Sequence, residues 1–273
     1  MTAAKIAFIG AGNMATSIIG GLVAQGYPSG TLSASDPYQP SLDNIRKLAD
    51  IFTSTNNNEV IAGASIVVLA VKPQIMANVA SGIRGAVDRE GALVISIAAG
   101  ITIGSLEKWL GRGAAIVRCM PNTPALVQAG ATGLYGNASV SEEHRKQAEK
   151  ILNATGITRW VEHETLLDAV TALSGSGPAY FFMFMEAMAE VGVKMGLDKE
   201  TSEQLAMHTC SGAAKMALQS ELDLVELRRR VCSPGGTTLK AVETFEQVGL
   251  AQLIESAMQA AFDRSVEMAK ELG

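Results

Sequence analysis

Hydrophobic residues in the first 160 positions form short apolar runs that alternate with longer amphipathic segments. A short apolar run fits a strand buried on both faces, whereas apolar positions three and four residues apart fit a helix with one buried face. Their alternation predicts a parallel β-sheet covered by helices. The predicted strands span residues 6–9, 32–34, 66–71, 93–98, 116–118, 132–134 and 157–160, and the predicted helices span 14–25, 42–49, 75–83, 103–110 and 142–153.

The strand patterns stop at about residue 163, and only helical periodicity continues from there. No internal repeat and no low-complexity linker separates the two regions, so we expect them to abut closely. The chain is therefore predicted to be βαβ first and all-α second. The predicted helices of the second region span residues 166–172, 180–194, 199–219, 224–231, 238–247 and 251–272.

The helix at 180–194 is apolar around nearly its whole circumference. Such a helix has to be buried on most of its sides. A core shared between two subunits buries it more fully than a single helical domain does, so we predict a homodimer built from this region. The methionines among these residues are interpreted as packing side chains. The apolar residues concerned are Phe181, Phe182, Met183, Phe184, Met185, Met188 and Val191.

A glycine motif of the form GxGxxA lies between the first predicted strand and the first predicted helix, at residues 10–15. Gly10 permits a tight turn, Gly12 lets the backbone approach a pyrophosphate, and Ala15 is small enough for the helix to pack on the sheet. The helix N-terminus adds unpaired N–H groups and a partial positive charge. An isolated pattern of this kind also fits an ordinary glycine turn, but this context predicts a dinucleotide-binding loop.

The second predicted strand ends at Ser35-Asp36-Pro37, at the position where a Rossmann-type fold places an acidic residue on the ribose. Taken alone, Asp36 favours NAD(H) over NADP(H). Two alternatives stay open: Ser35 and the following amides hold a 2′-phosphate, or Asp36-Pro37 only starts a turn. No arginine lies in this stretch, so the usual sign of an NADP site is absent.

Two further strands end in residues that suit the same cofactor. Ala70-Val71-Lys72-Pro73 closes one strand, and the small residues Ala98 and Ala99 close the next. Strand ends at this edge of a parallel sheet border the dinucleotide, and small side chains leave room for a ring. Lys72 fits a solvated loop lysine equally well.

In the second region, Ser233-Pro234-Gly235-Gly236-Thr237-Thr238 precedes a predicted helix. The amides of Gly236, Thr237 and Thr238 are expected to be free and to suit a carboxylate. A capped helix start, with Ser233 or Thr237 as the N-cap, fits the spacing as well. A second glycine-rich helix start at 173–178 contains Ser176 and is open to the same two interpretations.

Composition excludes several classes of protein. Of the 273 residues, 48% are hydrophobic and the formal charge is −5, which argues against nucleic acid as a partner. Three cysteines form no CxxC pair and lie far from any histidine, so we expect neither disulfides nor a metal site. The longest apolar stretch contains Glu186 and Glu190, which argues against a membrane span. We expect a cytoplasmic protein.

Catalytic motifs that rely on side-chain chemistry are absent. His144, His163 and His208 lie in no motif, and no Ser-His-Asp, paired-carboxylate or HExxH pattern occurs. Chemistry carried by a cofactor needs little more from the protein than binding and orientation.

These segments together resemble the pyrroline-5-carboxylate reductase family over nearly the whole chain. The similar segments are FIGAGNMA, LAVKPQ, SIAAGI, RCMPNTPAL, SGSGPAYFF and, as the most specific, LRRRVCSPGGTTLKAVETFE. The resemblance implies an α/β Rossmann-type dinucleotide-binding domain at 1–160 and an all-α helical dimerisation domain at 161–273, with the site between them at the subunit interface. Asp36 is the main departure and puts only the preference for NADPH in doubt.

The resemblance also implies the site residues. Residues 10–14 meet the pyrophosphate, Asn57 reaches the adenosine end, and residues 120–123 border the substrate pocket. The expected cofactor-binding residues are Gly10, Ala11, Gly12, Asn13, Met14, Ser35, Asp36, Asn57, Ala70, Val71, Lys72, Ala98 and Ala99. The expected substrate-binding residues are Asn122, Ser176, Ser233, Gly236, Thr237 and Thr238. Thr238 is the expected catalytic residue, since its hydroxyl is placed to hydrogen-bond the ring nitrogen of the substrate.

The implied activity is reduction of 1-pyrroline-5-carboxylate to L-proline with NADP(H) or NAD(H), the last step of proline biosynthesis. The implied assembly is a homodimer or a higher homo-oligomer built of dimers. Two alternatives remain: a reductase or dehydrogenase of another small imino or hydroxy acid, and a non-catalytic dimer that senses NADP(H).

Overall fold

The computed structural model describes residues 3–272, which form two compact units. The first unit contains the chain up to Ser176 and takes it up again from Ala261, whereas the second is Gly177–Ala260. These divisions differ from the predicted domain boundary at residue 160. The physical reason is that the segment after that residue packs on the sheet, where a Cβ at Gly133 would lie 2.7 Å from Val170.

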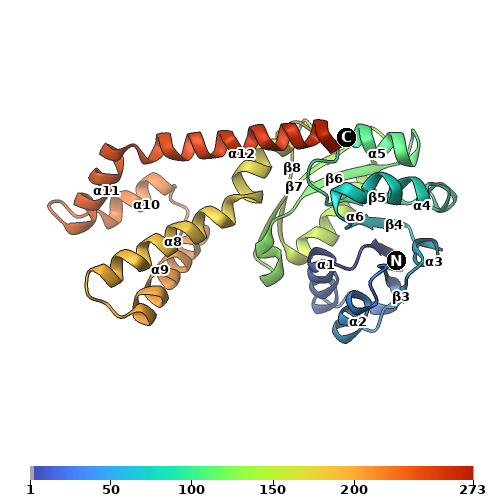
Figure 1. The fold of residues 1–273 in the computed structure, drawn as a ribbon, viewed down its shortest axis with the longest axis horizontal. Helices are drawn as coiled ribbons and strands as arrows, with labels where there is room; N and C mark the ends of the chain where they lie inside the picture. Colours follow the sequence, from blue (N-terminus) through green and yellow to red (C-terminus); the bar gives the residue numbers. More distant parts are fainter. Residues whose placement is uncertain (1–2, 273) are drawn as a thin grey trace. The chain divides into compact units, whose positions relative to one another are not determined.

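The first unit is built on an eight-stranded sheet in the order β3-β2-β1-β4-β5-β6-β7-β8 among the described residues (Figure 1). Strands β1 to β6 are parallel, β7 runs antiparallel to β6, and β8 is parallel to β7. The strands are β1 Ile6–Ile9, β2 Leu32–Ser35, β3 Phe52–Ser54, β4 Ile66–Leu69, β5 Leu93–Ser96, β6 Ile116–Met120, β7 Gly130–Gly136 and β8 Gly156–Trp160. The strand order reverses between β1 and β4, and such a switch point opens a ligand crevice at the carboxyl ends of the strands.

Helices cover both faces of this sheet. Side chains alternate along β1, so that Phe8 packs with the helices of one face and Ile9 with those of the other. One face carries α1 Asn13–Ala24, α2 Gln39–Leu48 and α6 Glu142–Leu152, and the other carries α3 Asn57–Ile61, α4 Met76–Glu90 and α5 Ile103–Leu110. The short helix α7 Leu166–Val170 packs beside β7.

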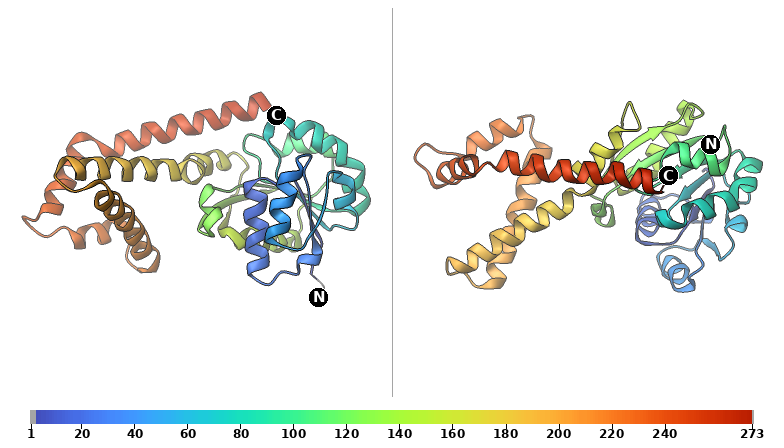
Figure 2. Two further views of the ribbon diagram at one scale, coloured as in Figure 1. Left: turned by 60° about the horizontal axis from the view of Figure 1, so that its bottom comes forward. Right: turned by 45° about the horizontal axis from the view of Figure 1, so that its top comes forward.

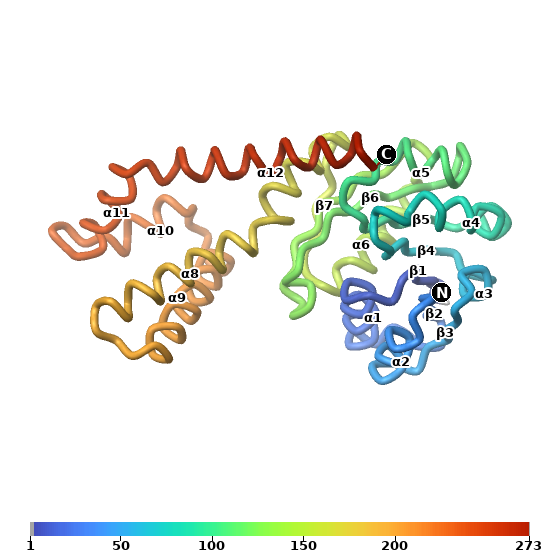
Figure 3. The backbone as a smooth tube through the Cα atoms, in the orientation of Figure 1, coloured from blue at the N-terminus to red at the C-terminus, as the bar shows by residue number. Residues whose placement is uncertain are grey.

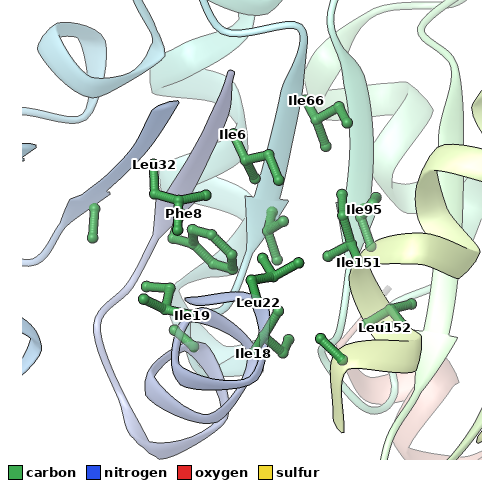
Figure 4. Close-up of a cluster of buried hydrophobic side chains, with 14 of the residues drawn as sticks. Ile6, Phe8, Ile18, Ile19, Leu22, Leu32, Ile66, Ile95, Ile151 and Leu152 are labelled. Atoms are coloured by element: carbon green, nitrogen blue, oxygen red, sulfur yellow. The ribbon is translucent and has the colours of Figure 1, made fainter. Parts of the chain in front are cut away.

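The core on the first of these faces is fully buried. Figure 4 shows the ring of Phe8 beside Ile18, Ile19 and Leu22 of α1, with Ile151 of α6 completing the cluster. Each of these side chains is at most 2% exposed. Burying a side chain of this size stabilises the fold by about 1.5–3 kcal/mol, so this core fixes α1, and with it the loop that precedes it, against the sheet.

The predicted elements are confirmed in type, but several bounds and one strand pairing need correction. The helix predicted at 75–83 continues to Glu90 as α4. Strand β3 and helix α3 were not predicted, because β3 is a three-residue edge strand whose Phe52 is 54% exposed. Strands β4 and β5 each end two residues earlier than predicted, at Leu69 and Ser96. The predicted parallel sheet contains one antiparallel pair, since β6 and β7 are joined by a connection with no crossover helix.

The second unit is helical. It contains α8 Gly177–Lys194, α9 Lys199–Gln219, α10 Leu224–Val231, α11 Thr237–Val248 and the beginning of α12 Leu250–Leu272. Helices α8 and α9 lie side by side (Figure 3), and the Ser202 hydroxyl of α9 donates a 2.7 Å hydrogen bond to the Ala189 carbonyl of α8. The Phe184 and Phe245 rings lie 6.2 Å apart, which ties α11 to α8.

Helix α8 leaves most of its apolar surface uncovered. Phe181, Phe182 and Met183 are 61%, 62% and 72% exposed, and only Gly177 and Ala189 are buried. The prediction that this helix is buried on most sides is therefore wrong for a single chain. We call the residues Phe181, Phe182, Met183, Met188 and Val191 the open α8 face. Several large apolar side chains exposed on one helix mark an interaction site.

The last turns of α12 belong to the first unit. The buried Ser265 hydroxyl donates a 2.6 Å hydrogen bond to the buried Asp168 carboxylate of α7. Leu272 and Met268 lie against Gly100, where an added Cβ would meet them at 3.2 and 3.3 Å. Figures 1 and 2 show the C-terminal end beside α5. These contacts hold the chain's end against the loop that follows β5.

Candidate functional site

The glycine loop lies at the switch point between β1 and β4. Gly10 has a φ of +100°, and a Cβ there would lie 2.6 Å from the Ala70 carbonyl oxygen, so only glycine fits. Its N–H donates a 2.8 Å hydrogen bond to the Ser35 carbonyl. Gly12 has no heavy atom within 4 Å of the position a Cβ would take. The loop is thus fixed on one side and open on the other.

Helix α1 presents an uncapped N-terminus to this open side. Its N-cap is Gly12, no side chain caps it, and its first turn carries no acidic residue. The first amides of a helix have no intrahelical acceptor, and the helix dipole adds partial positive charge there. Open space beside free amides fits the pyrophosphate of a dinucleotide.

Asp36 connects the end of β2 to the glycine loop. One carboxylate oxygen accepts a 2.9 Å hydrogen bond from the Ala11 N–H, and the other accepts a 2.9 Å bond from the Tyr38 N–H. The second bond is the turn predicted as an alternative, and the first is a contact that a turn alone does not require. Asp36 therefore orders the glycine loop as well as the turn.

Ser35 is fully buried, and its hydroxyl donates a 2.7 Å hydrogen bond to the Asn57 side-chain oxygen. Pro37 has no N–H, and the Tyr38 N–H is taken by Asp36. The Ser35 hydroxyl and the Tyr38 amide, which the sequence offered to a 2′-phosphate, thus already have protein partners. Asn57, by contrast, is brought to the end of β2 from the start of α3.

The strand ends predicted to border the nicotinamide are in register. Ile9 of β1 lies beside Leu69 of β4, which lies beside Ser96 of β5. The residues that follow them therefore leave the sheet at the same edge. Ala70, Val71 and Ala99 are half-buried, Ala98 is 5% exposed, and Lys72 is exposed.

In the second unit, α11 begins one residue earlier than predicted, and its N-cap is Gly236 without any side-chain cap. The alternative of Ser233 or Thr237 as N-cap is therefore wrong. The Gly236 amide is not free as expected, because it donates a 2.9 Å hydrogen bond to the Ser233 carbonyl. Thr237 and Thr238 are exposed in the first helical turn, where amides lack intrahelical acceptors. Two of the three amides predicted for a carboxylate thus remain.

Space at this helix start is limited by the turn before it. A Cβ at Gly236 would lie 3.0 Å from the Ser233 carbonyl oxygen, closer than most side chains tolerate. Gly235 has a φ of +70°, which favours glycine. The turn places Ser233 beside the first residues of α11.

Nearby, Arg229 and then Arg230 hydrogen-bond to Glu226 and lower the pKa of that carboxyl to about 2. The ion pairs partly neutralise the three consecutive arginines that end α10. The positive charge of these arginines is therefore partly offset by Glu226 and Glu246.

Asn122 and Ser176 both lie in the first unit, and Ser174 connects them. The Asn122 side-chain amide donates a 3.0 Å hydrogen bond to the Ser174 carbonyl, and its oxygen accepts a 2.9 Å bond from the Ala131 N–H. The Ser176 N–H donates to the Thr171 carbonyl at 2.8 Å. The polar atoms of Asn122 thus have protein partners, whereas Ser176 is half-buried at the end of the first unit.

Sequence reasoning missed a buried ion pair near the site. Arg118 of β6 lies 2.8 Å from Glu164, and the same Glu164 oxygen accepts a 2.8 Å bond from the Ile103 N–H that begins α5. The Arg118 side chain is 6% exposed. The partners are 46 positions apart and in no motif, so no local signal could have paired them.

Other chemically reactive groups do not form a site. Burial raises the pKa of the Cys119 thiol, which keeps it protonated and unreactive. Within residues 3–272, no three His, Cys, Asp or Glu side chains gather as a metal-ligand set. Along the same described stretch, no helix has the length and apolarity needed to cross a membrane.

The reversed sheet order, the glycine loop and the uncapped α1 define a class: a Rossmann-type oxidoreductase with a second, helical unit. Comparison with known proteins narrows the class. Residues 5–100 match the family described as NADP oxidoreductase coenzyme F420-dependent, and residues 164–268 match the family described as pyrroline-5-carboxylate reductase dimerisation. The chain belongs to the pyrroline-5-carboxylate reductase family.

Individual relatives agree along the whole chain. The pyrroline-5-carboxylate reductase of Pseudomonas aeruginosa is 51% identical over 273 residues, with 100% of both chains covered. The solved structure of a pyrroline-5-carboxylate reductase from Coxiella burnetii has a TM-score of 0.95 at 42% identity and covers 98% of this chain and 99% of its own. That of the Plasmodium falciparum enzyme with NADP bound has a TM-score of 0.85 at 31% identity, with the same coverage.

Proposed function

We propose that this protein reduces 1-pyrroline-5-carboxylate to L-proline, the last step of proline biosynthesis, with NADP(H) as its cofactor and NAD(H) as the alternative. The observation that carries the proposal is the glycine loop at the switch point, where Gly12 leaves open space beside the free amides of α1. Membership of the family then selects the substrate.

The geometry of the first unit supports the cofactor-binding residues that we propose. A bound nicotinamide dinucleotide supplies the hydride. The loop at residues 10–14 binds its pyrophosphate, Asp36 faces the ribose, and Asn57 stands at the adenosine end, where Ser35 holds its side chain. Ala70, Val71, Lys72, Ala98 and Ala99 border the nicotinamide. The small side chains of Ala70, Ala98 and Ala99 leave room for the ring.

The start of α11 supports the substrate-binding residues that we propose. The amides of Thr237 and Thr238 bind the substrate carboxylate, and Gly236 keeps the approach clear. The bound carboxylate holds the ring so that its imine carbon faces the nicotinamide. Holding the reactants in this geometry lowers the barrier to hydride transfer. Thr238 is the catalytic residue, because its hydroxyl hydrogen-bonds the ring nitrogen as the nitrogen becomes an amine.

Three further residues belong to the proposed substrate site: Ser233, Asn122 and Ser176. Ser233 fixes the turn before α11 through its carbonyl, and Ser176 ends the segment that Asn122 holds. At the level of domains we retain residues 1–160 for dinucleotide binding and 161–273 for the helical, dimer-forming part.

The assembly we propose is a homodimer in the cytoplasm, alone or as the unit of a larger homo-oligomer. The match of residues 164–268 to a dimerisation family supports self-association. The open α8 face supports it independently, because this apolar surface has no cover within its own unit.

The deciding experiment measures oxidation of NADPH and of NADH by the purified protein with 1-pyrroline-5-carboxylate, and identifies proline as the product. We expect turnover with at least one cofactor. Oxidation only with another imine or with a hydroxy acid would assign a different substrate. Cofactor binding without turnover on any of these would indicate a sensor, and either result would overturn the proposal.

A further inference from the structure

The chain passes from α7 into α8 through a π-helical segment, Thr171–Gly175, and a proline follows three positions later at Pro178. In this segment the Ser176 N–H donates to the Thr171 carbonyl, five residues back. In a continuous α-helix the Ser174 carbonyl would accept from the N–H of residue 178. Proline has no N–H, and its ring crowds the carbonyl four residues before it. The sequence thus deprives Ser174 of its helical donor.

Asn122 supplies the donor that proline removes. Its side-chain Nδ2 donates to the Ser174 carbonyl at 3.0 Å, and its Oδ1 accepts from the Ala131 N–H of β7 at 2.9 Å. Asn122 is 8% exposed, so water does not compete freely for these bonds. One side chain therefore links the loop after β6, the start of β7 and the π-helical segment.

A second contact joins the same loop to the same segment. A Cβ at Gly175 would lie 2.6 Å from the Met120 side-chain methyl, so only a glycine lets the two approach this closely. Met120 and Asn122 thus hold consecutive residues, Gly175 and Ser174. The segment that ends at Ser176 has its position set by the loop after β6.

We infer that Asn122 is a positioning residue for the reduction, which acts by holding the Ser174 carbonyl left unpaired by Pro178. The inference rests on the proposed function, in which Ser176 and residues 120–123 lie on the substrate side. Asn122 itself touches neither substrate nor cofactor in this role. Removing it releases the segment, and a displacement of about 1 Å near reacting groups costs on the order of 100-fold in rate.

The first test is Asn122→Ala in the full-length protein. We expect kcat to fall at least about 10-fold while KM for the imine and for the cofactor changes by less than about 3-fold, since alignment is lost rather than a binding contact. Asn137→Ala is the matched control. Asn137 likewise bridges two backbone groups, accepting from the Ile116 N–H at 3.1 Å and donating to the Ala114 carbonyl at 2.9 Å. It acts at the first residue of β6, at the opposite end of that strand from residues 120–123. It should lower the melting temperature and leave kcat unchanged.

The second test uses Pro178→Ala, which restores an N–H that can pair with the Ser174 carbonyl. In this background Asn122→Ala should lower kcat by less than about 3-fold, because the carbonyl no longer depends on the asparagine. If Asn122→Ala does not fold, Asn122→Leu replaces it. Leucine has nearly the shape of asparagine, carries no charge and removes the donor to Ser174, so the same rescue is expected.

A readout without substrate separates this inference from the proposed function. Hydrogen exchange of the amides at 174–177 should quicken at least about 10-fold in Asn122→Ala, and by much less when Pro178→Ala is also present. A wild-type protein that does not turn over the imine would overturn the proposed function. Unchanged exchange in Asn122→Ala, an unchanged kcat in an active enzyme, an effect confined to KM, or a loss of kcat that Pro178→Ala does not rescue would each overturn the role of Asn122.

Discussion

At the scale of single residues, we propose that Asp36 governs the choice between NADPH and NADH. Its carboxylate accepts from both Ala11 and Tyr38, so it stands fixed beside the glycine loop. A fixed negative charge repels a 2′-phosphate more than a 2′-hydroxyl. The neighbouring Ser35 hydroxyl is buried and already donates to Asn57, so it is not free to donate a hydrogen bond to a 2′-phosphate.

We therefore predict that Asp36→Ser raises the ratio of kcat/KM for NADPH over NADH, by about 10-fold or more if the ribose is in contact. Because the Ala11 amide loses its acceptor, kcat/KM for NADH should also fall in absolute terms. The measurement is steady-state kinetics with both cofactors. An unchanged ratio would show that the side chain does not reach the ribose.

Thr238 offers a second test at the scale of single residues. Thr238→Ala keeps the backbone amide at the start of α11 and removes only the hydroxyl. Since no side chain caps this helix, the free energy of unfolding of the variant should lie within about 0.5 kcal/mol of that of the wild type. If the hydroxyl guides the ring nitrogen, kcat should fall about 10-fold or more. Full kcat in this variant would move the catalytic role elsewhere.

Gly236→Val is the complementary variant, because it crowds the carboxylate rather than the nitrogen. A branched side chain at this position meets the Ser233 carbonyl and narrows the approach to α11. KM for the imine should therefore rise by more than KM for NADPH. Equal changes in both constants would argue that this turn does not hold the carboxylate.

The sequence predicted individual residues well where one backbone position determines the role. Gly10 is an example, since its strand-to-helix turn is local and its φ of +100° demands glycine. The sequence did not predict contacts whose two partners lie far apart along the chain. The bonds Ser35 to Asn57 and Arg118 to Glu164, and the Gly236 amide closing its own turn, arise only from the folded arrangement.

At the scale of elements, the end of α12 depends on one buried polar pair. The Ser265 hydroxyl and the Asp168 carboxylate are 6% and 8% exposed and 97 positions apart. Ser265→Ala removes the hydroxyl and leaves a buried carboxylate short of a partner, which costs about 1–3 kcal/mol. Thermal or denaturant unfolding measures this loss.

Ser256→Ala is the matched control on the same helix. The Ser256 hydroxyl donates to the Gln252 carbonyl within its own exposed helical turn. Its removal should change the free energy of unfolding by less than about 0.5 kcal/mol. Equal effects of the two substitutions would mean that the bond to Asp168 does not anchor α12.

Long elements were predicted to exist and short ones were not, although the prediction ended α4 at residue 83 rather than at Glu90. The pattern predicted α9 with the bounds that the structure shows, Lys199–Gln219. It missed β3 and α3, whose three and five residues are too few for a period to emerge. It predicted one helix at 166–172, whereas α7 ends at Val170 and a π-helical segment continues to Gly175, a change that the sequence period does not mark.

For the molecule as a whole, the open α8 face is the feature that predicts assembly. We expect sedimentation to show a dimer as the smallest folded species, and Phe182→Asp to shift the protein toward monomers or unfolded chains. A charge placed in an apolar contact is costly to bury. Phe52→Asp is the control, because Phe52 is similarly exposed, at 54%, but lies on the edge strand β3. An active, monodisperse monomer would contradict the prediction.

The open α8 face also makes the stability of this chain depend on its concentration. When a second copy covers such a surface, folding and association are one equilibrium, and the melting temperature rises with the concentration of protein. At low abundance, a newly synthesised chain would be bound by chaperones or degraded by proteases before it could dimerise. The amount of enzyme in a cell would then respond more than proportionally to its rate of synthesis.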